Sequence, residues 1–163
     1  MNLARVAFAL ALVVSATSAF AEITLINAWM RPAPAGAEAA RAYVDIKSDR
    51  TLDLVGARTP IAKRVAIVRV AKVGDESTEK VVKSLAVLGG TTTRLAYLGD
   101  HLRLIDVTRN VGNGDPVPLT LVFKDGAGKT VEAATEITVR GLLLPQQMTP
   151  RTQDAPHAKK PGT

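Results

Sequence analysis

The chain has 163 residues, of which 47% are hydrophobic and 22% charged, a composition typical of one folded globular domain. It contains no cysteine, which excludes disulfides, thiolate metal sites, cysteine nucleophiles and lipid attachment to an N-terminal cysteine. Two histidines, His101 and His157, are too few for a histidine-rich metal cage, so most enzyme classes are disfavoured. The net charge of +6 is scattered, and few aromatic residues accompany it, so no nucleic-acid partner is predicted.

Residues 1–21 have the three parts of a secretory signal peptide. Arg5 supplies the positive start, residues 6–14 form an uncharged apolar run, and Ala19-Phe20-Ala21 is an A-x-A cleavage site. We therefore expect cleavage after Ala21 and a periplasmic location. The apolar run is too short to span a bilayer comfortably, and no later segment is apolar enough, so no transmembrane segment is predicted after cleavage.

From residue 22 to residue 144 the sequence consists of short β-branched runs separated by turn residues. This pattern predicts a single domain built as an antiparallel β-sandwich. The expected strands are 23–26, 42–47, 52–57, 65–70, 81–87, 91–95, 102–107, 119–123 and 131–139.

Three segments between and after these strands need separate interpretation. Residues 37–42 alone have fair helix propensity, over one turn at most. Residues 124–129 contain G-x-G-K, but they lie between two strands and lack the spacing of a phosphate-binding loop, so we interpret them as a hairpin turn. Residues 145–163 have no apolar periodicity and are predicted to be a disordered tail.

Residues 28–36, with the sequence A-W-M-R-P-A-P-A-G, resemble the A-W-x-R-P-x-P-x-G segment of the periplasmic PCuAC copper chaperones. Residues 114–123, G-D-P-V-P-L-T-L-V-F, are similar to the G-D-x-V-P-L-T-L-x-F strand of that family. Weaker similarities occur in order between them, at residues 42–46, 53–57, 60–62 and 88–91.

The resemblance implies a cupredoxin-like or immunoglobulin-like Greek-key β-sandwich. It also implies a function, because PCuAC proteins carry Cu(I) in the periplasm and supply it to cytochrome oxidase. Their ligands follow the spacing H-x10-M-x21-H-x-M, which suits copper because thioether sulfur is soft and selects Cu(I).

Anchored on His101, the four ligand positions of this motif fall on Val68, Glu79, His101 and Arg103. Only His101 is retained as a metal ligand, so the site is predicted to be degenerate. One hypothesis is that a Glu79–Arg103 ion pair fills the space of the metal; the other is that both are ordinary exposed residues. His101 is interpreted as a surface histidine at a strand start more readily than as a ligand.

Met148 and His157 in the tail are a second, weaker candidate for metal donors beside His101. Trp29 and Tyr43 are predicted to be core residues and not cofactor contacts.

Two functions are consistent with these observations. The first is a periplasmic copper chaperone-like protein with a degenerate site, with a cytochrome oxidase subunit or another copper protein as partner. The alternative is a non-metal protein-binding module that keeps the fold; an enzyme is not predicted.

Overall fold

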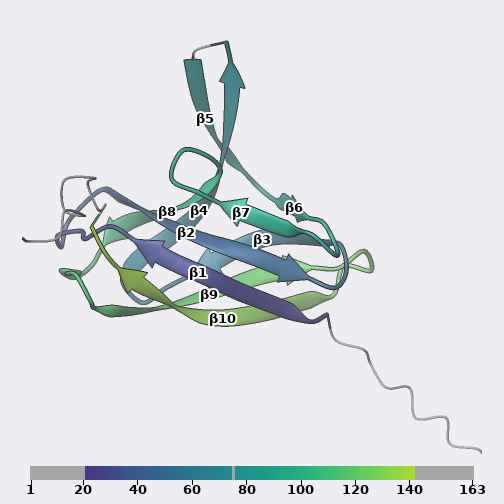
Figure 1. The fold of residues 1–163 in the computed structure, drawn as a ribbon. Helices are drawn as coiled ribbons and strands as arrows, with labels where there is room; N and C mark the ends of the chain where they lie inside the picture. The colour runs from purple at the N-terminus through teal and green to yellow at the C-terminus, as the bar shows by residue number, and fades with distance from the viewer. Residues whose placement is uncertain (1–20, 75, 142–163) are drawn as a thin grey trace, which may run out of the picture.

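The computed structural model describes residues 21–74 and 76–141, and every regular element within them is a β-strand (Figure 1). Residues 1–20 and the predicted tail, including Met148 and His157, lie outside these ranges. No helix among the described residues could cross a membrane. The strands are β1 (Ile23–Met30), β2 (Ala39–Ser48), β3 (Leu52–Arg58), β4 (Ala62–Val73), β5 (Glu76–Val82), β6 (Leu85–Val87), β7 (Thr92–Leu95), β8 (His101–Val107), β9 (Pro116–Lys124) and β10 (Thr130–Val139).

The strands follow the order β5-β4-β8-β2-β1-β10-β9-β3-β6, and β7 also pairs with β2. Among the described strands all pairs are antiparallel except β1 and β10, where Trp29 lies opposite Thr138 in a parallel ladder. The first and last strands are therefore neighbours at the centre of this order. The predicted all-β class is confirmed.

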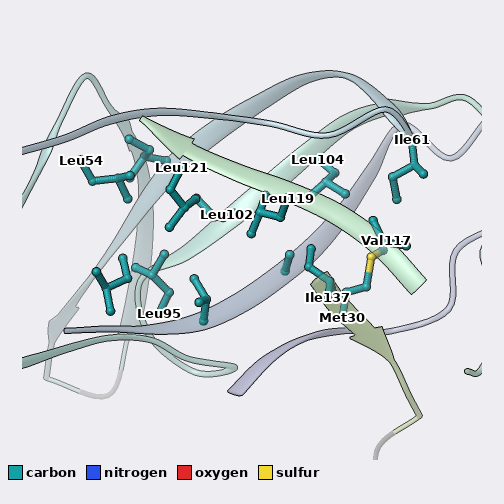
Figure 2. Packing of buried hydrophobic residues seen from close by; sticks show 14 of the residues in the cluster. Met30, Leu54, Ile61, Leu95, Leu102, Leu104, Val117, Leu119, Leu121 and Ile137 are labelled. Atoms are coloured by element: carbon teal, nitrogen blue, oxygen red, sulfur yellow. The ribbon is translucent and has the colours of Figure 1, made fainter. Parts of the chain in front are cut away.

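One hydrophobic core lies inside the wrapped sheet, where inward side chains of β2 and β8 meet those of β3 and β9 (Figure 2). Side chains alternate between the two faces of a strand, so Leu102 and Leu104 of β8 point into this core. Burying each such side chain contributes about 1.5–3 kcal/mol. Other members of the core include Met30, Leu54, Ile61, Leu95, Val117, Leu119, Leu121 and Ile137.

Two predicted elements differ from the structure. The single strand expected at 81–87 is two strands, β5 and β6, because the chain leaves its pairing with β4 at Val82 and pairs with β3 from Leu85 onward. The segment 37–42 contains no helix; Ala39–Ala42 is extended and pairs with β8. Long-range pairing overrides the weak local helix propensity there.

The outer parts of β4 and β5 form a hairpin that rises away from the sandwich (Figure 1). Its outer residues are exposed, as Val73 shows with 73% of its surface accessible. At its base, the backbone N–H of Val70 donates to Asp100 Oδ1 at 2.8 Å, which ties the hairpin to the loop before β8. Glu79 of β5 also hydrogen-bonds Arg41 of β2 and Arg103 of β8, so the base of the hairpin is held against these two strands.

The loop between β1 and β2 alternates residues that can and cannot donate a backbone hydrogen bond. Ala33 exchanges two hydrogen bonds with Val111, at 3.0 and 2.9 Å, and Ala35 donates to Asn110 Oδ1 at 2.7 Å. The intervening Pro32 and Pro34 have no N–H, so they leave no donor unsatisfied on the open side of the loop. This loop is consequently held against the sandwich.

Candidate functional site

The candidate site lies on the outer face of β2, β4 and β8, under the base of the hairpin. Because Leu102 and Leu104 point into the core, His101 and Arg103 project from the opposite face of β8. On β2, Arg41 and Tyr43 project to the same outer side for the same reason. The site is therefore built on paired strands, which hold side chains in a fixed register.

The structure brings together all four positions that the PCuAC motif assigns. Val68 lies directly opposite His101 in the β4–β8 ladder, and Arg103 is two residues further along the same face of β8. Glu79 reaches this face from β5 and hydrogen-bonds Arg103. Four positions spread over a span of 36 residues in the chain thus become neighbours in the fold, as a shared site requires.

Glu79 is bound by two arginines, one of which the sequence did not indicate. Its Oε2 accepts a hydrogen bond from Arg103, and its Oε1 accepts one from Arg41 Nη2 at 2.8 Å. Arg41 and Arg103 lie directly opposite each other in the β2–β8 ladder, an arrangement that is unfavourable for like charges. The carboxylate between them offsets this repulsion. The Glu79–Arg103 ion pair is confirmed, and Arg41 is the third residue of the same bridge.

His101 is buried, with 1% of its surface exposed, so the interpretation as a surface histidine is wrong. Tyr43 and the loop at residues 97–99 lie against it, a long-range covering that its own sequence neighbours do not reveal. Its Nδ1 lies 3.0 Å from the carbonyl oxygen of Gly99, and because a carbonyl only accepts, Nδ1 carries the proton. Nε2 is also buried, and it has no hydrogen-bond partner among the described residues.

The donor set around His101 does not fit Cu(I). Within residues 21–74 and 76–141, no three histidine, cysteine or acidic residues gather where they could hold a metal. The one methionine in these ranges, Met30, is fully buried in the core. His101 thus offers one imidazole nitrogen without a thioether beside it, and Cu(I) prefers soft sulfur ligands.

An open groove of about 560 Å³ adjoins this cluster. We call it the arginine groove, because three guanidinium groups line it, those of Arg31, Arg41 and Arg103. Its other lining residues are Pro32, Ala33, Pro34, Ala37, Ala39, Ala40, Tyr43 and Tyr97. Burial raises the pKa of the Tyr43 hydroxyl above its ordinary value, and the positive charges of Arg41 and Arg31 partly oppose this rise. Three arginines and no acidic residue are among the described residues that line the groove, so its lining is electropositive.

Trp29 and Tyr43 stack on each other next to the groove, with ring centroids 4.5 Å apart. Tyr43 is buried as predicted, but the pair packs on the outer face, and neither ring belongs to the main hydrophobic cluster. Trp29 is half-buried, and the Arg140 guanidinium lies 5.0 Å from its ring centroid, within the range of a cation–π contact. Tyr97 completes the row at 6.0 Å from Tyr43.

Comparison with known proteins found similar sequences and similar solved structures. A family model described as "Putative lipoprotein LpqE-like" matches residues 23–135. A protein of Leifsonia xyli subsp. xyli named "Putative lipoprotein Lxx21020" is 27% identical over 110 residues, which cover 67% of this chain and 66% of that protein. The chain thus spans just under two thirds of the length of this relative.

Two solved structures are similar over most of their length. The copper-bound PCuAC domain of PmoF2 has a TM-score of 0.56 at 20% identity, covering 74% of this chain and 93% of that one. The Cu(I) form of DR1885 from Deinococcus radiodurans has a TM-score of 0.53 at 30% identity, covering 69% and 74%. The likeness to PmoF2 shows the fold, and it confirms the predicted cupredoxin-like sandwich.

Proposed function

The chain belongs to the LpqE-like family and its resemblance to the PCuAC family is confirmed, and from this premise we propose an exported, copper-chaperone-like protein whose metal position is closed by a salt bridge. The similarity to PCuAC domains supports a copper-chaperone-like role in general. One observation carries the closed position: the carboxylate of Glu79 lies between Arg41 and Arg103, where the family motif assigns two sulfur ligands. Two fixed guanidinium groups beside His101 repel a cation.

Copper titration tests this proposal directly. Cu(I) is titrated into the purified protein against a chromophoric chelator, and we expect no stoichiometric binding tighter than micromolar. The double variant Glu79→Met and Arg103→Met removes the bridge and supplies two thioethers next to His101, so it is expected to bind about one equivalent. Adding Val68→His completes the family motif and should tighten binding further.

A matched control replaces another glutamate–arginine pair by methionines. Arg58 and Glu132 form a two-bonded ion pair on another part of the sandwich, and their replacement supplies two thioethers without a histidine. This variant should not gain copper. Tight binding of one equivalent by the unmodified protein, lost in His101→Ala, would show that the position is open and the proposal wrong.

The second candidate function is a protein-binding module that needs no metal. The arginine groove favours it, because a preformed electropositive groove on rigid strands is suited to a protein ligand. By family resemblance the partner is a periplasmic copper protein such as a cytochrome oxidase subunit. We propose binding and not catalysis for this surface. The two functions separate on metal stoichiometry, because a carrier must bind copper and a module need not.

We also propose that residues 1–21 are removed on export to the periplasm and that Glu22 is the first mature residue. The backbone of Glu22 supports this site: its N–H donates to Asp49 Oδ1 at 3.1 Å, and its carbonyl accepts from the Asp49 N–H at 3.2 Å. Cleavage there gives a charged amino group next to this carboxylate. Mass spectrometry of the protein from a periplasmic fraction should find Glu22 at its start, and another start would refute the site.

A further inference from the structure

We propose that the arginine groove binds an acidic peptide segment of a partner protein. This inference deepens the second candidate function and does not depend on copper. It starts from charge: three guanidinium groups line the groove, and among the described residues none of those lining it is acidic. Glu79 neutralises Arg41 and Arg103 only in part, because one carboxylate serves two cations.

The arginines keep free hydrogen-bond donors. A guanidinium has five N–H donors, and the described contacts of Arg41 and Arg103 use one nitrogen each, on Glu79. Arg31 is exposed and has no ion pair or hydrogen bond to any described residue. Arginine binds carboxylates through paired N–H groups, so these free donors suit aspartate or glutamate side chains.

The rest of the lining favours a peptide over a small anion. Pro32, Ala33 and Pro34 form an apolar wall beside the arginines, and Tyr43 and Tyr97 present aromatic rings. A volume of about 560 Å³ holds several side chains, far more than one inorganic ion occupies. A ligand that combines carboxylates with apolar side chains can use both parts, and an acidic peptide has this composition.

The groove is preorganised, which favours affinity because little ordering is needed on binding. The apolar wall is fixed by the two hydrogen bonds between Ala33 and Val111 and by the bond from Ala35 to Asn110. Arg41 and Arg103 are held by their shared carboxylate. Only Arg31 among the three is free to adjust to a ligand.

Selection from a displayed library of random peptides tests the inference with the whole protein immobilised. We expect selected peptides to be several-fold enriched in aspartate and glutamate next to apolar residues. Arg31→Glu should abolish this enrichment. The control is Arg64→Glu, which changes the net charge equally at an exposed arginine of β4 outside the groove and should leave the enrichment intact.

A selected peptide is then titrated in solution, with Trp29 as reporter. Trp29 is the one tryptophan of the chain and stacks on Tyr43, which lines the groove, so its emission should change on binding. Arg31→Ala should weaken the peptide about tenfold or more, the effect of losing a charge-assisted hydrogen bond. A peptide with asparagine and glutamine in place of its acidic residues should not bind.

Four results would overturn the inference. No acidic enrichment, or equal loss of it in the Arg31 and Arg64 variants, would show that the groove itself selects nothing. Binding of inorganic phosphate without peptide binding would indicate an ion site. Binding to phosphatidylglycerol vesicles that depends on Arg31, without peptide selection, would indicate a membrane contact. None of these results bears on copper, so the titration above remains an independent test of the first function.

Discussion

Replacing Glu79 by glutamine should expose the repulsion between the two arginines that it now bridges. Arg41 and Arg103 occupy directly opposite positions on β2 and β8, and glutamine keeps the shape of the side chain but removes its charge. The side chains are partly accessible, at 46% for Arg41, 28% for Arg103 and 32% for Glu79, so solvent screens each interaction. Exposed ion pairs contribute about 0.2–1 kcal/mol each, which gives about 1–2 kcal/mol for the loss of both together with the new repulsion.

Urea denaturation of a set of variants measures this effect. In the unmodified protein, Arg41→Gln should lower the free energy of unfolding slightly, because it removes an attraction to Glu79. In the Glu79→Gln background, the same Arg41→Gln change should raise it, because it now removes a repulsion. This reversal of sign is a coupling that two independent residues cannot produce.

The salt dependence of the unfolding free energy is a second test on the same variants. The destabilisation in Glu79→Gln should shrink as salt is raised, because the screening length falls from about 10 Å at 0.1 M to about 3 Å at 1 M. Equal effects of Arg41→Gln in both backgrounds, together with no dependence on salt, would refute the electrostatic account of the bridge.

Two further predictions concern stability away from the site. Gly89→Ala should destabilise the protein by about 1–3 kcal/mol, because the added Cβ would lie 2.7 Å from backbone atoms of Arg50. As a control, Gly126→Ala should change the free energy of unfolding little, because no atom lies within 4 Å of the added Cβ. Hydrogen bonding by Arg58 lowers the pKa of Glu132 in the folded protein. The pair should therefore stabilise the fold at pH values above the ordinary pKa of glutamate. This stabilisation should be lost as the pH falls through the lowered pKa. The melting temperature of Glu132→Gln should therefore lie below that of the unmodified protein at neutral pH and converge with it in acid; a constant difference would contradict the linkage.

The strands could be predicted from the sequence because their signal is local. Alternation in segments such as 42–47 and the turn residues at 124–129 specify strands and hairpins without knowledge of the partners. The turn is a hairpin between β9 and β10, and Asp125 Oδ1 accepts hydrogen bonds from the N–H groups of Ala127 and Lys129. The division of 81–87 depends on pairing with two distant strands, which the segment itself does not record.

The site was predictable only where the resemblance to the PCuAC motif assigned its positions. The motif spacing placed Glu79 beside Arg103, but Arg41 was missed because its position opposite Arg103 depends on the register of β2 against β8. The alternation of Arg41 with the buried Ala42 is a signal that Arg41 faces outward, yet one sequence does not give the partner. The burial of His101 was missed for the same reason, because Tyr43 and the loop at 97–99 cover it from elsewhere.

The bridge at Glu79 connects three strands without a metal. A metal held at positions 79, 101 and 103 would tie the hairpin to β8 only while it is bound, whereas the bridge from Glu79 to Arg41 and Arg103 ties β5 to β8 and β2 without any ligand. A carrier benefits from a tie that forms and breaks with its cargo. A docking surface benefits from a connection that is always present, because its groove then has the shape that the partner needs before binding. The same ion pair that argues against copper at this position therefore argues for a permanent binding face beside it.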